Sequence, residues 1–315
     1  MSQFNKGKFS RNLAATAILA PTMIIVGCSS SSGSSSSSDG ADGSSEGFAY
    51  DGYLKNAVVC VDENLNKACD LGEPRTTTGD GGLFSLDSLT DAQVQLPLVL
   101  QATSSTIDED DGASVDGNLK FLAPAGSKAI SGFSTIIQAK VEKALAEGST
   151  ASLANLKASA AAELATELGV DGVDLTAFDP IAAKTDGSTS EEAQTNAAKL
   201  HLVNQVLSQQ IATLVPQANA NSNGNETAAF GALVNKLNAT NVKQAVDNDT
   251  AGLALPELKT ALAEVIVSAT APSVPTTEEI EEQASEDEVV KEIIEEDVTE
   301  EPTGATGATG GSGTS

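Results

Sequence analysis

The sequence contains very few aromatic side chains. Phe, Tyr and Trp make up 3% of its 315 residues, and Trp is absent. A sugar-stacking platform would have to be built from very few rings, and the core must be mostly aliphatic. Histidine occurs once, at position 201, which excludes the usual histidine-based zinc sites. Because His201 lies beside the helical stripe Leu200, Val203 and Leu207, we expect a buried structural histidine rather than a general base.

Basic residues are scarce as well. The chain has 17 Lys and Arg against 44 Asp and Glu, which gives a formal net charge of −27. Binding of nucleic acid through its phosphates needs basic patches and is therefore excluded. Such an acidic chain favours solubility and the attraction of cations. The sequence has no P-loop and no GxGxxG after a strand, so neither of these nucleotide-binding classes is indicated.

Near the N-terminus there is an apolar run, residues 13–26, which is too short for a stable membrane span. It follows three basic residues, as in a secretory signal peptide. The run ends in Ile25-Val26-Gly27-Cys28, which resembles a bacterial lipobox. The resemblance implies that residues 1–27 are a lipoprotein signal peptide and that Cys28 carries acyl chains such as palmitate. It also favours the outer membrane, on its surface or its periplasmic face. An ordinary cleaved signal peptide with an incidental Cys is the alternative.

The chain has only three cysteines. If Cys28 carries lipid, Cys60 and Cys69 remain as an even pair in an oxidising compartment, and we expect a disulfide between them. Cys60 ends an expected strand, and Cys69 lies in the loop that follows, so the bridge would staple the loop to the strand. A catalytic or metal-binding cysteine pair is the weaker alternative, because no His lies near in the sequence.

Residues 62–73 have the ligand order of an EF-hand calcium loop. Counting from Asp62 as position 1, oxygen-bearing side chains stand at positions 1, 3, 5, 9 and 12, and position 7 needs only its backbone carbonyl. Lys67 stands at position 6, where the EF-hand has Gly, so Lys67 must take a strained backbone or the turn must differ. A polar surface turn is the alternative. The expected calcium ligands are Asp62, Asn64, Asn66, Ala68, Asp70 and Glu73.

The residues around this loop carry a second resemblance. The chain reads Gly-Tyr-Leu-Lys-Asn-Ala-Val-Val over residues 52–59, then the loop with Glu-Pro at its end, then Gly-Leu-Phe over residues 82–84. This order is similar to the calcium-bearing collagen-adhesin B-type (Sdr B-like) modules of bacterial surface proteins and to the N-terminal part of Gram-negative surface lipoproteins. It covers about residues 51–89. The resemblance implies a transthyretin-like (prealbumin-like) β-sandwich in which calcium is structural and the module acts as a stalk or spacer.

The hydrophobic pattern predicts an α+β protein. Alternation predicts short strands that would form a small antiparallel sandwich, and a helical period begins near residue 128. Between Glu278 and Glu301 there are 13 acidic residues and one Lys, which favours disorder. Val289-Val290 and Ile293-Ile294 stand at helical spacing, so a transient amphipathic helix is the alternative. The expected strands cover residues 53–61, 83–86, 96–103 and 118–123. The expected helices cover residues 132–147, 150–168, 188–215, 228–237 and 258–269. The expected segments are a Ser/Gly-rich tether (28–47), the calcium-loop β-sandwich (48–127), an α-helical domain (128–271) and a disordered acidic tail (272–315).

We therefore expect a non-enzymatic lipoprotein of the outer membrane or cell surface that serves adhesion or envelope interaction, with a surface protein or polysaccharide as partner. One alternative is a polysaccharide- or peptide-processing hydrolase whose site lies between sandwich and helices and uses Asp171, Asp174 and Asp179. A cleft with two facing carboxylates and a raised pKa would support it. A third option is a periplasm-facing partner of an export or envelope complex. The acidic stretch 108–112 is expected to be a solvated hairpin tip, with a second cation site as the alternative.

Overall fold

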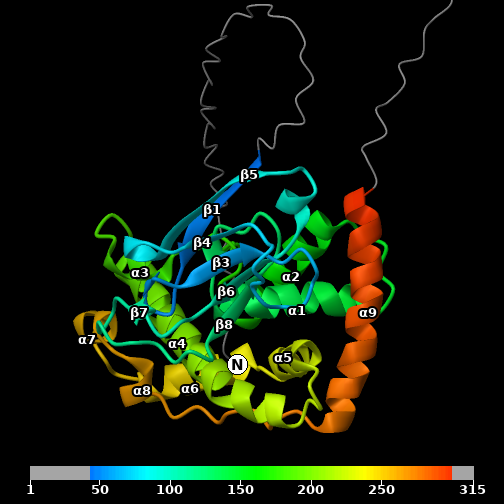
Figure 1. The fold of residues 1–315 in the computed structure, drawn as a ribbon. Helices are drawn as coiled ribbons and strands as arrows, with labels where there is room; N and C mark the ends of the chain where they lie inside the picture. The colour runs from blue at the N-terminus through cyan, green and yellow to red at the C-terminus, as the bar shows by residue number, and fades with distance from the viewer. Residues whose placement is uncertain (1–42, 300–315) are drawn as a thin grey trace, which may run out of the picture. The chain divides into compact units, whose positions relative to one another are not determined.

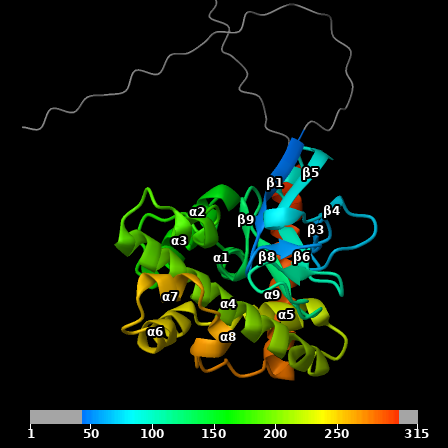
Figure 2. The same ribbon diagram turned by 90° about the vertical axis from the view of Figure 1, so that its left-hand side faces the viewer.

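The computed structural model describes residues 43–299 (Figures 1 and 2). The expected signal peptide, Cys28, residues 29–42 of the tether and residues 300–315 of the tail lie outside these residues. The described part is mixed α+β, as the sequence predicted. Among residues 43–299, no helix combines the length and the apolar character needed to cross a membrane.

Within the described residues, the strands form small sheets. The four-stranded sheet has the order β4-β3-β6-β8, and its neighbours are antiparallel. Its register sets Val59 opposite Leu100 and Leu100 opposite Phe121, and all three side chains are buried. Its strands are β3 (Val58–Val61), β4 (Arg75–Thr77), β6 (Leu98–Gln101) and β8 (Lys120–Ala123). The other sheets have the orders β5-β1-β9 and β2-β7, from β1 (Gly43–Ala49), β2 (Leu54–Lys55), β5 (Leu83–Leu89), β7 (Ile107–Asp108) and β9 (Ala129–Ile130).

Strand β1 corrects the expected end of the tether. Residues 43–47 were expected to be flexible spacer, but they pair with β5, and the end of β1 also pairs with β9. Gly47 shows why a Gly-rich segment can pack here: a Cβ at this position would lie 2.1 Å from the Lys128 carbonyl oxygen. The glycine therefore permits a close backbone approach, and the ladder hydrogen bonds satisfy the backbone of a segment whose composition suggested a linker.

The helices begin at polar caps that the sequence supplies. The side chains of Ser131, Ser152 and Ser190 each accept a backbone N–H in the first turn of the helix that follows. The expected helix over 258–269 is wrong, because the chain forms two short helices there, and α3 and α6 were not predicted. The helices are α1 (Gly132–Ala146), α2 (Leu153–Glu167), α3 (Pro180–Thr185), α4 (Glu191–Ala220), α5 (Glu226–Asn235), α6 (Ala239–Asp249), α7 (Leu255–Lys259), α8 (Ala263–Ile266) and α9 (Thr277–Thr299).

Helix α4 organises the helical part. It contacts α1, α3, α5, α6, α7 and α8, and Figure 2 shows these helices gathered around it. The stripe predicted on this helix is buried, from Leu200 to Leu214. One hydrophobic cluster joins Phe121 of β8, Ile211 of α4 and Phe230 of α5. The sheet and the helices therefore share core contacts, and residues 43–299 belong to one compact unit.

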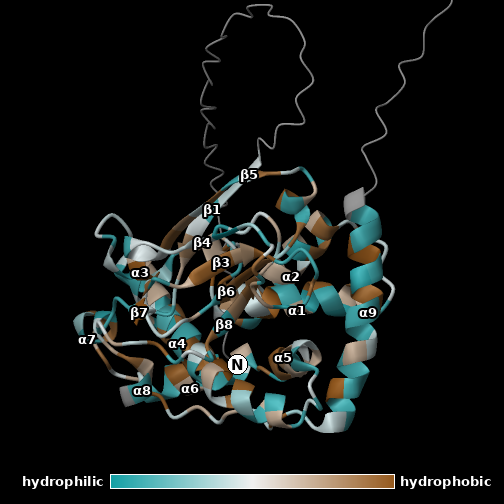
Figure 3. Cartoon of the chain, viewed as in Figure 1, coloured by the Kyte–Doolittle hydropathy of each residue, from teal (hydrophilic) through white to brown (hydrophobic). Residues whose placement is uncertain are grey.

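Helix α9 overturns the expected disorder of the acidic tail over residues 277–299. It lies beside α1 and α5 (Figure 1), and Figure 3 shows hydrophilic and hydrophobic segments alternating along it. Ile280, Val290 and Ile294 are buried on its inner face. Gly231 of α5 permits the approach, since a Cβ there would come within 3.0 Å of the Gln283 side chain. Burial of this apolar stripe, at about 25 cal/mol per Å², opposes the repulsion between its many carboxylates.

Candidate functional site

The expected calcium loop follows β3 and is closed by the predicted disulfide. Cys60 at the end of β3 is bonded to Cys69, with the two Cα atoms 5.6 Å apart. The Cys69 N–H also donates to the Gln101 side chain at the end of β6, over 3.0 Å. The disulfide is therefore confirmed, and it fixes the middle of the loop against the four-stranded sheet.

The loop backbone turns at two left-handed residues, Leu65 and Lys67, each with φ of 58°. Lys67 thus takes the conformation that Gly takes at position 6 of an EF-hand, which costs an L-residue about 1 kcal/mol or more. The Asp62 carboxylate holds this turn, because its two oxygens accept the N–H groups of Asn66 and Lys67 over 2.9 and 2.8 Å. Of the two possibilities stated for Lys67, the structure has the strained backbone.

The two ends of the loop are joined through Glu73. Its carboxylate oxygens accept the N–H groups of Glu63 and Asp70, over 3.0 and 2.8 Å. Asp62 and Glu73 are both nearly buried. Burial raises the pKa of Asp62 to about 6; the Lys67 N–H opposes this shift, and the Glu73 charge adds to it. Burial also raises the pKa of Glu73. Burial thus disfavours the ionised forms of these two carboxyl groups, and a bound cation would compensate that cost.

The middle of the loop is polar and internally bonded. Asn64 and Asn66 each donate from their amide nitrogens to the same oxygen of Asp70, over 2.8 Å. The Asn66 amide oxygen accepts the Ala68 N–H, over 2.9 Å. The six expected ligands therefore lie within one folded loop, and their side-chain donors are all oxygens, the ligand type that calcium prefers.

These oxygen ligands are of the type that calcium prefers. The carboxylates alone, however, do not form a metal-binding group. Within residues 43–299, no group of three or more His, Cys, Asp and Glu side chains is gathered closely enough to hold a metal ion. Asp62, Asp70 and Glu73 would need the amide oxygens of Asn64 and Asn66 and the Ala68 carbonyl to complete the site. An ionised carboxylate oxygen that accepts one N–H keeps a further acceptor position for such an ion.

Lys67 has a role that sequence reasoning missed. Its ammonium group points away from the loop and lies 2.9 Å from Asp287 of α9 and 3.3 Å from Glu142 of α1. The side chain is 5% exposed. Burial lowers the pKa of Lys67, but the two carboxylates raise it more, so the pKa lies above its usual value. Together with the Thr227 hydroxyl of α5, which donates to the Asn66 carbonyl, this ion pair fastens the loop to three helices.

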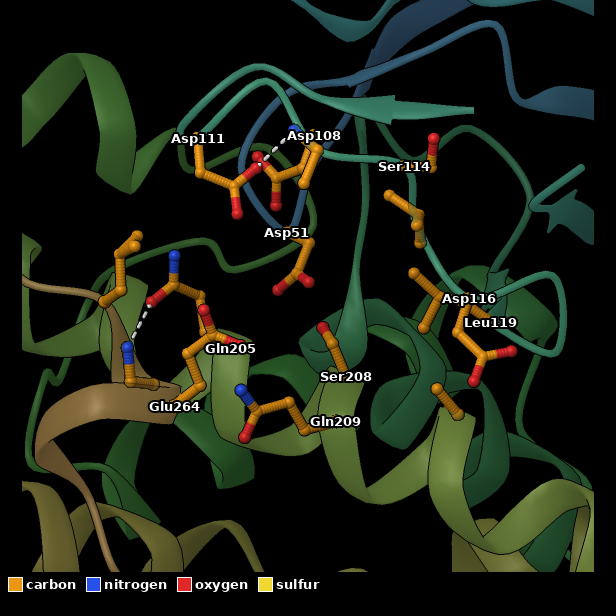
Figure 4. Close-up of a pocket in the computed structure, with 15 residues that line it drawn as sticks. Asp51, Asp108, Asp111, Ser114, Asp116, Leu119, Gln205, Ser208, Gln209 and Glu264 are labelled. Atoms are coloured by element: carbon orange, nitrogen blue, oxygen red, sulfur yellow. Dashed lines mark hydrogen bonds between the residues drawn. The ribbon is translucent and has the colours of Figure 1, made fainter. Parts of the chain in front are cut away.

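A second candidate site is a pocket of about 230 Å³ between the loop after β7 and helices α4 and α8 (Figure 4). Five acidic residues from separate parts of the chain line it, and the described lining includes no basic residue. Glutamine and serine side chains of α4 and an apolar wall complete the lining. The acidic residues are Asp51, Asp108, Asp111, Asp116 and Glu264.

Asp51 is the central acid of this pocket. Figure 4 shows its carboxyl group pointing into the pocket, its Oδ1 atom is shielded from solvent, and the Ser208 hydroxyl beside it opposes the rise of its pKa. Burial raises the pKa of Asp51 well above its usual range, with a further contribution from Asp108. Burial also raises the pKa of Asp108, to about 6, although both of its oxygens accept backbone N–H groups, from Gly52 and Asp110. Residues 108–112 form the expected hairpin turn, and Asp108 and Asp111 line this pocket.

His201 is buried and fully hydrogen-bonded, as the sequence predicted. Its Nδ1 lies 2.8 Å from the Lys184 ammonium, which must donate, so Nε2 carries the proton and donates to the Asp51 carbonyl over 2.7 Å. Burial and the Lys184 charge lower the pKa of His201 to about 3. The ring is therefore neutral, and it holds the backbone that presents Asp51 to the pocket.

The carboxylates proposed for a hydrolase serve local structure. Asp171 accepts the Thr166 hydroxyl, and Asp174 accepts two bonds from Thr176. Asp179 caps α3 and also accepts the Tyr53 hydroxyl over 2.7 Å. None of these three aspartates lines the pocket around Asp51. The pocket acid itself gave no sequence signal, because Asp51 becomes important only when the loop after β7 and helix α4 approach it.

Comparisons of the chain with protein-family models, with curated proteins and with solved structures found no match. Only the loop, the pocket and the motifs of the sequence therefore point to a function.

Proposed function

We propose that this protein is a non-enzymatic lipoprotein, attached through acyl chains on Cys28 to the outer membrane, in which calcium bound at Asp62–Glu73 stiffens a module for adhesion or envelope interaction. The observation that carries the proposal is the folded loop. Asp62 and Glu73 are nearly buried at its two ends, and its backbone is left-handed at Lys67. Asp62, Asn64, Asn66, the Ala68 carbonyl, Asp70 and Glu73 would hold the ion.

Calcium at this loop would act mechanically. The ion would compensate the two buried carboxylates, and binding to the folded state alone adds about 2.7 kcal/mol of stability at a hundredfold excess over Kd. Lys67 and Thr227 connect the loop to α1, α5 and α9, so ordering the loop would also order the helical part. In this proposal the four-stranded sheet is the counterpart of the transthyretin-like sandwich of the adhesin modules, and the unit serves as a spacer for a surface protein or polysaccharide partner.

The calcium proposal is tested by calorimetry on a soluble form that starts at Ser29 and keeps α9. We expect about one ion per chain and a higher melting temperature with calcium than with chelator. Asp62→Ala/Glu73→Ala should abolish binding. The control Asp87→Ala/Asp91→Ala removes the same charge from exposed positions and should bind as the parent does. The absence of binding at millimolar calcium, or equal weakening in both variants, would contradict the proposal.

The lipid anchor is tested on the full chain in a Gram-negative host. Labelled palmitate should be incorporated by the parent and lost in Cys28→Ala. Protease treatment of intact cells then separates the two faces of the outer membrane, because a surface lipoprotein is cleaved and a periplasm-facing one is protected. Incorporation that persists in Cys28→Ala would contradict the anchor.

The hydrolase alternative has one observation in its favour, which is that Asp51 and Asp108 line one pocket and both have a raised pKa. Glycoside hydrolysis needs one carboxyl group as acid and a second as base or nucleophile. Both oxygens of Asp108 are engaged by backbone N–H groups, so Asp108 is poorly suited to act as the base or nucleophile. We therefore favour binding over hydrolysis at this pocket.

A further inference from the structure

An apolar pocket of about 210 Å³ lies where α1, α2 and α9 meet the turn after β8. Its described lining includes no acidic residue, although the chain has 44 Asp and Glu. A carbon chain that enters this pocket would bury apolar surface, which is favourable. The apolar wall includes Val94, Pro97, Pro124, Val141, Leu153 and Ile294.

Lys157 of α2 is the one charged residue in the described lining of this pocket. Its half-buried ammonium group donates to the Ala125 carbonyl over 2.9 Å, which leaves two of its three N–H donors for other acceptors. Burial lowers the pKa of Lys157, and the charge of Asp174 opposes this shift only in part. An anion at Lys157 would therefore compensate the desolvation of the ammonium group.

A second pocket, of about 580 Å³, adjoins the first at this lysine. Ala125, Gly126, Ala154 and Lys157 line both pockets. The Gly126 backbone lies beside the ammonium group, since a Cβ on Gly126 would be 3.8 Å from the Lys157 Nζ atom. The charged end of a ligand can therefore meet Lys157 where the two pockets join, while its carbon chain occupies the first pocket.

The charges around this junction favour an anion. Lys128 and Lys157 line the second pocket together with one carboxylate, Asp174, whose Oδ1 atom already accepts two bonds from Thr176. In the first pocket Lys157 has no acidic neighbour in the described lining. Although the whole chain has a net charge of −27, salt screens distant charges and charge-assisted hydrogen bonds act at contact.

We propose that the first pocket binds a medium-chain fatty acid, whose carboxylate accepts hydrogen bonds from the Lys157 ammonium while its carbon chain packs against Val141, Leu153 and Ile294. The carbon chain must be short, because about 210 Å³ is less than the roughly 300–1,000 Å³ of drug-sized sites. Helices that contact one another, α1 with α2 and with α9, form much of the wall. Binding therefore orders no new segment, which keeps its entropic cost low.

The test is calorimetry of sodium octanoate with the soluble form that starts at Ser29, with chelator present and at about 150 mM salt. We expect one saturable site, with an affinity that rises about fourfold for each CH₂ from butanoate to octanoate. Octylammonium should bind about tenfold more weakly or less, although the net charge of the chain attracts cations. The absence of octanoate binding at about 5 mM, or equal affinity for the two ions, would overturn the proposal.

Substitution of Lys157 tests the contact with the carboxylate. Lys157→Met removes the ammonium group, keeps an apolar side chain and should weaken octanoate binding about tenfold or more. The control Lys55→Met removes a cation that pairs with Asp80 at the surface and should change Kd less than about twofold. Equal loss of affinity in the two variants would show that octanoate responds only to the total charge, which would overturn the proposal.

A pair of size variants tests the place of the carbon chain. Ala154 lines both pockets, whereas Ala158, one turn further along α2, lines only the second. Both residues are exposed, so Leu at either position should leave the fold intact. Ala154→Leu narrows the first pocket and should weaken octanoate binding about tenfold or more, whereas Ala158→Leu should have little effect. Equal effects of the two variants would overturn the proposal.

The fatty-acid site and the calcium loop can fail separately. The proposed calcium ligands do not line either pocket, so Asp62→Ala/Glu73→Ala should bind octanoate as the parent does. Loss of octanoate binding in this folded variant would place the ligand elsewhere and overturn the proposal.

Discussion

At the scale of single residues, Lys67 makes a prediction about stability. Its ammonium group is buried between Asp287 and Glu142, and removal of one partner from a buried ion pair leaves the others uncompensated. We expect Lys67→Met to lower the free energy of unfolding by about 3 kcal/mol, measured by urea denaturation. One oxygen of Asp287 already lacks a hydrogen-bond partner, so the loss of Lys67 would leave the Asp287 charge buried and uncompensated.

The matched control is Lys55→Met. Lys55 pairs with Asp80 at the surface, where the two side chains are 40% and 84% exposed, and water and salt screen such exposed pairs so that they add little to stability. Lys67→Met/Asp287→Leu should recover part of the loss, because it removes the stranded charge as well. Equal changes in the free energy of unfolding for Lys67→Met and Lys55→Met would contradict a larger contribution of the buried ion pair.

Lys67 also shows what the sequence could and could not reveal about the site. The ligand order of the loop and the disulfide partners follow from local spacing, so they were predictable. That position 6 lacks Gly was visible too. The compensating contacts, which come from residues 75 and 220 positions further along the chain, were not, because no local pattern links Lys67 to Glu142 or Asp287. Asp51 could not be identified from the sequence either, because the elements that form its pocket are distant in the chain.

At the scale of elements, the docking of α9 can be tested by substitution of Val290, with the neighbouring Val289 as the control. Val290 is 5% exposed and Val289 is 43% exposed. Val290→Asp would bury a carboxylate without a partner and should lower the free energy of unfolding by about 3 kcal/mol or release the helix. Val289→Asp should cost less than about 1 kcal/mol. Urea denaturation measures both variants, and limited proteolysis detects release. Equal tolerance of the two changes would contradict the docking of α9.

Elements whose order depends on local pattern were predicted, and those that depend on distant partners were not. The stripe on α4 is long and regular, so its period alone identified it. The inner face of α9 reads Ile280, Gln283, Asp287, Val290 and Ile294 at spacings of three and four residues. Two polar members interrupt this apolar stripe, so the sequence indicated a transient helix at most. The order of the helix depends on Lys67, on Gly231 and on Lys236, which lies 2.7 Å from Glu279. Strand β1 was missed because its order comes from β5 and β9.

At the scale of the whole molecule, the buried carboxyl groups predict an unusual dependence of stability on pH. The pKa values of Asp62 and Asp108 are about 6, and that of Asp51 is higher than usual, whereas an unfolded Asp titrates near about 3.9. Between about pH 4 and 6 the native state therefore holds protons that the unfolded state has lost, so stability falls as pH rises through this window. Loss of negative charge on acidification also reduces self-repulsion in a chain of net charge −27.

We therefore expect the protein, with chelator present, to melt several degrees higher at pH 5 than at pH 7, as measured by calorimetry at fixed ionic strength. His201 opposes the trend. Its native pKa is about 3, so below about pH 6.5 the unfolded state binds a proton that the native state does not, and stability falls as pH falls. One imidazole acts against several carboxyl groups, so the carboxyl effect wins. Calcium should narrow the difference between the two pH values, because the ion binds the ionised forms of Asp62 and Glu73 and competes with their protons. A lower melting temperature at pH 5 than at pH 7 without calcium would show that these carboxyl groups are not buried as the structure has them.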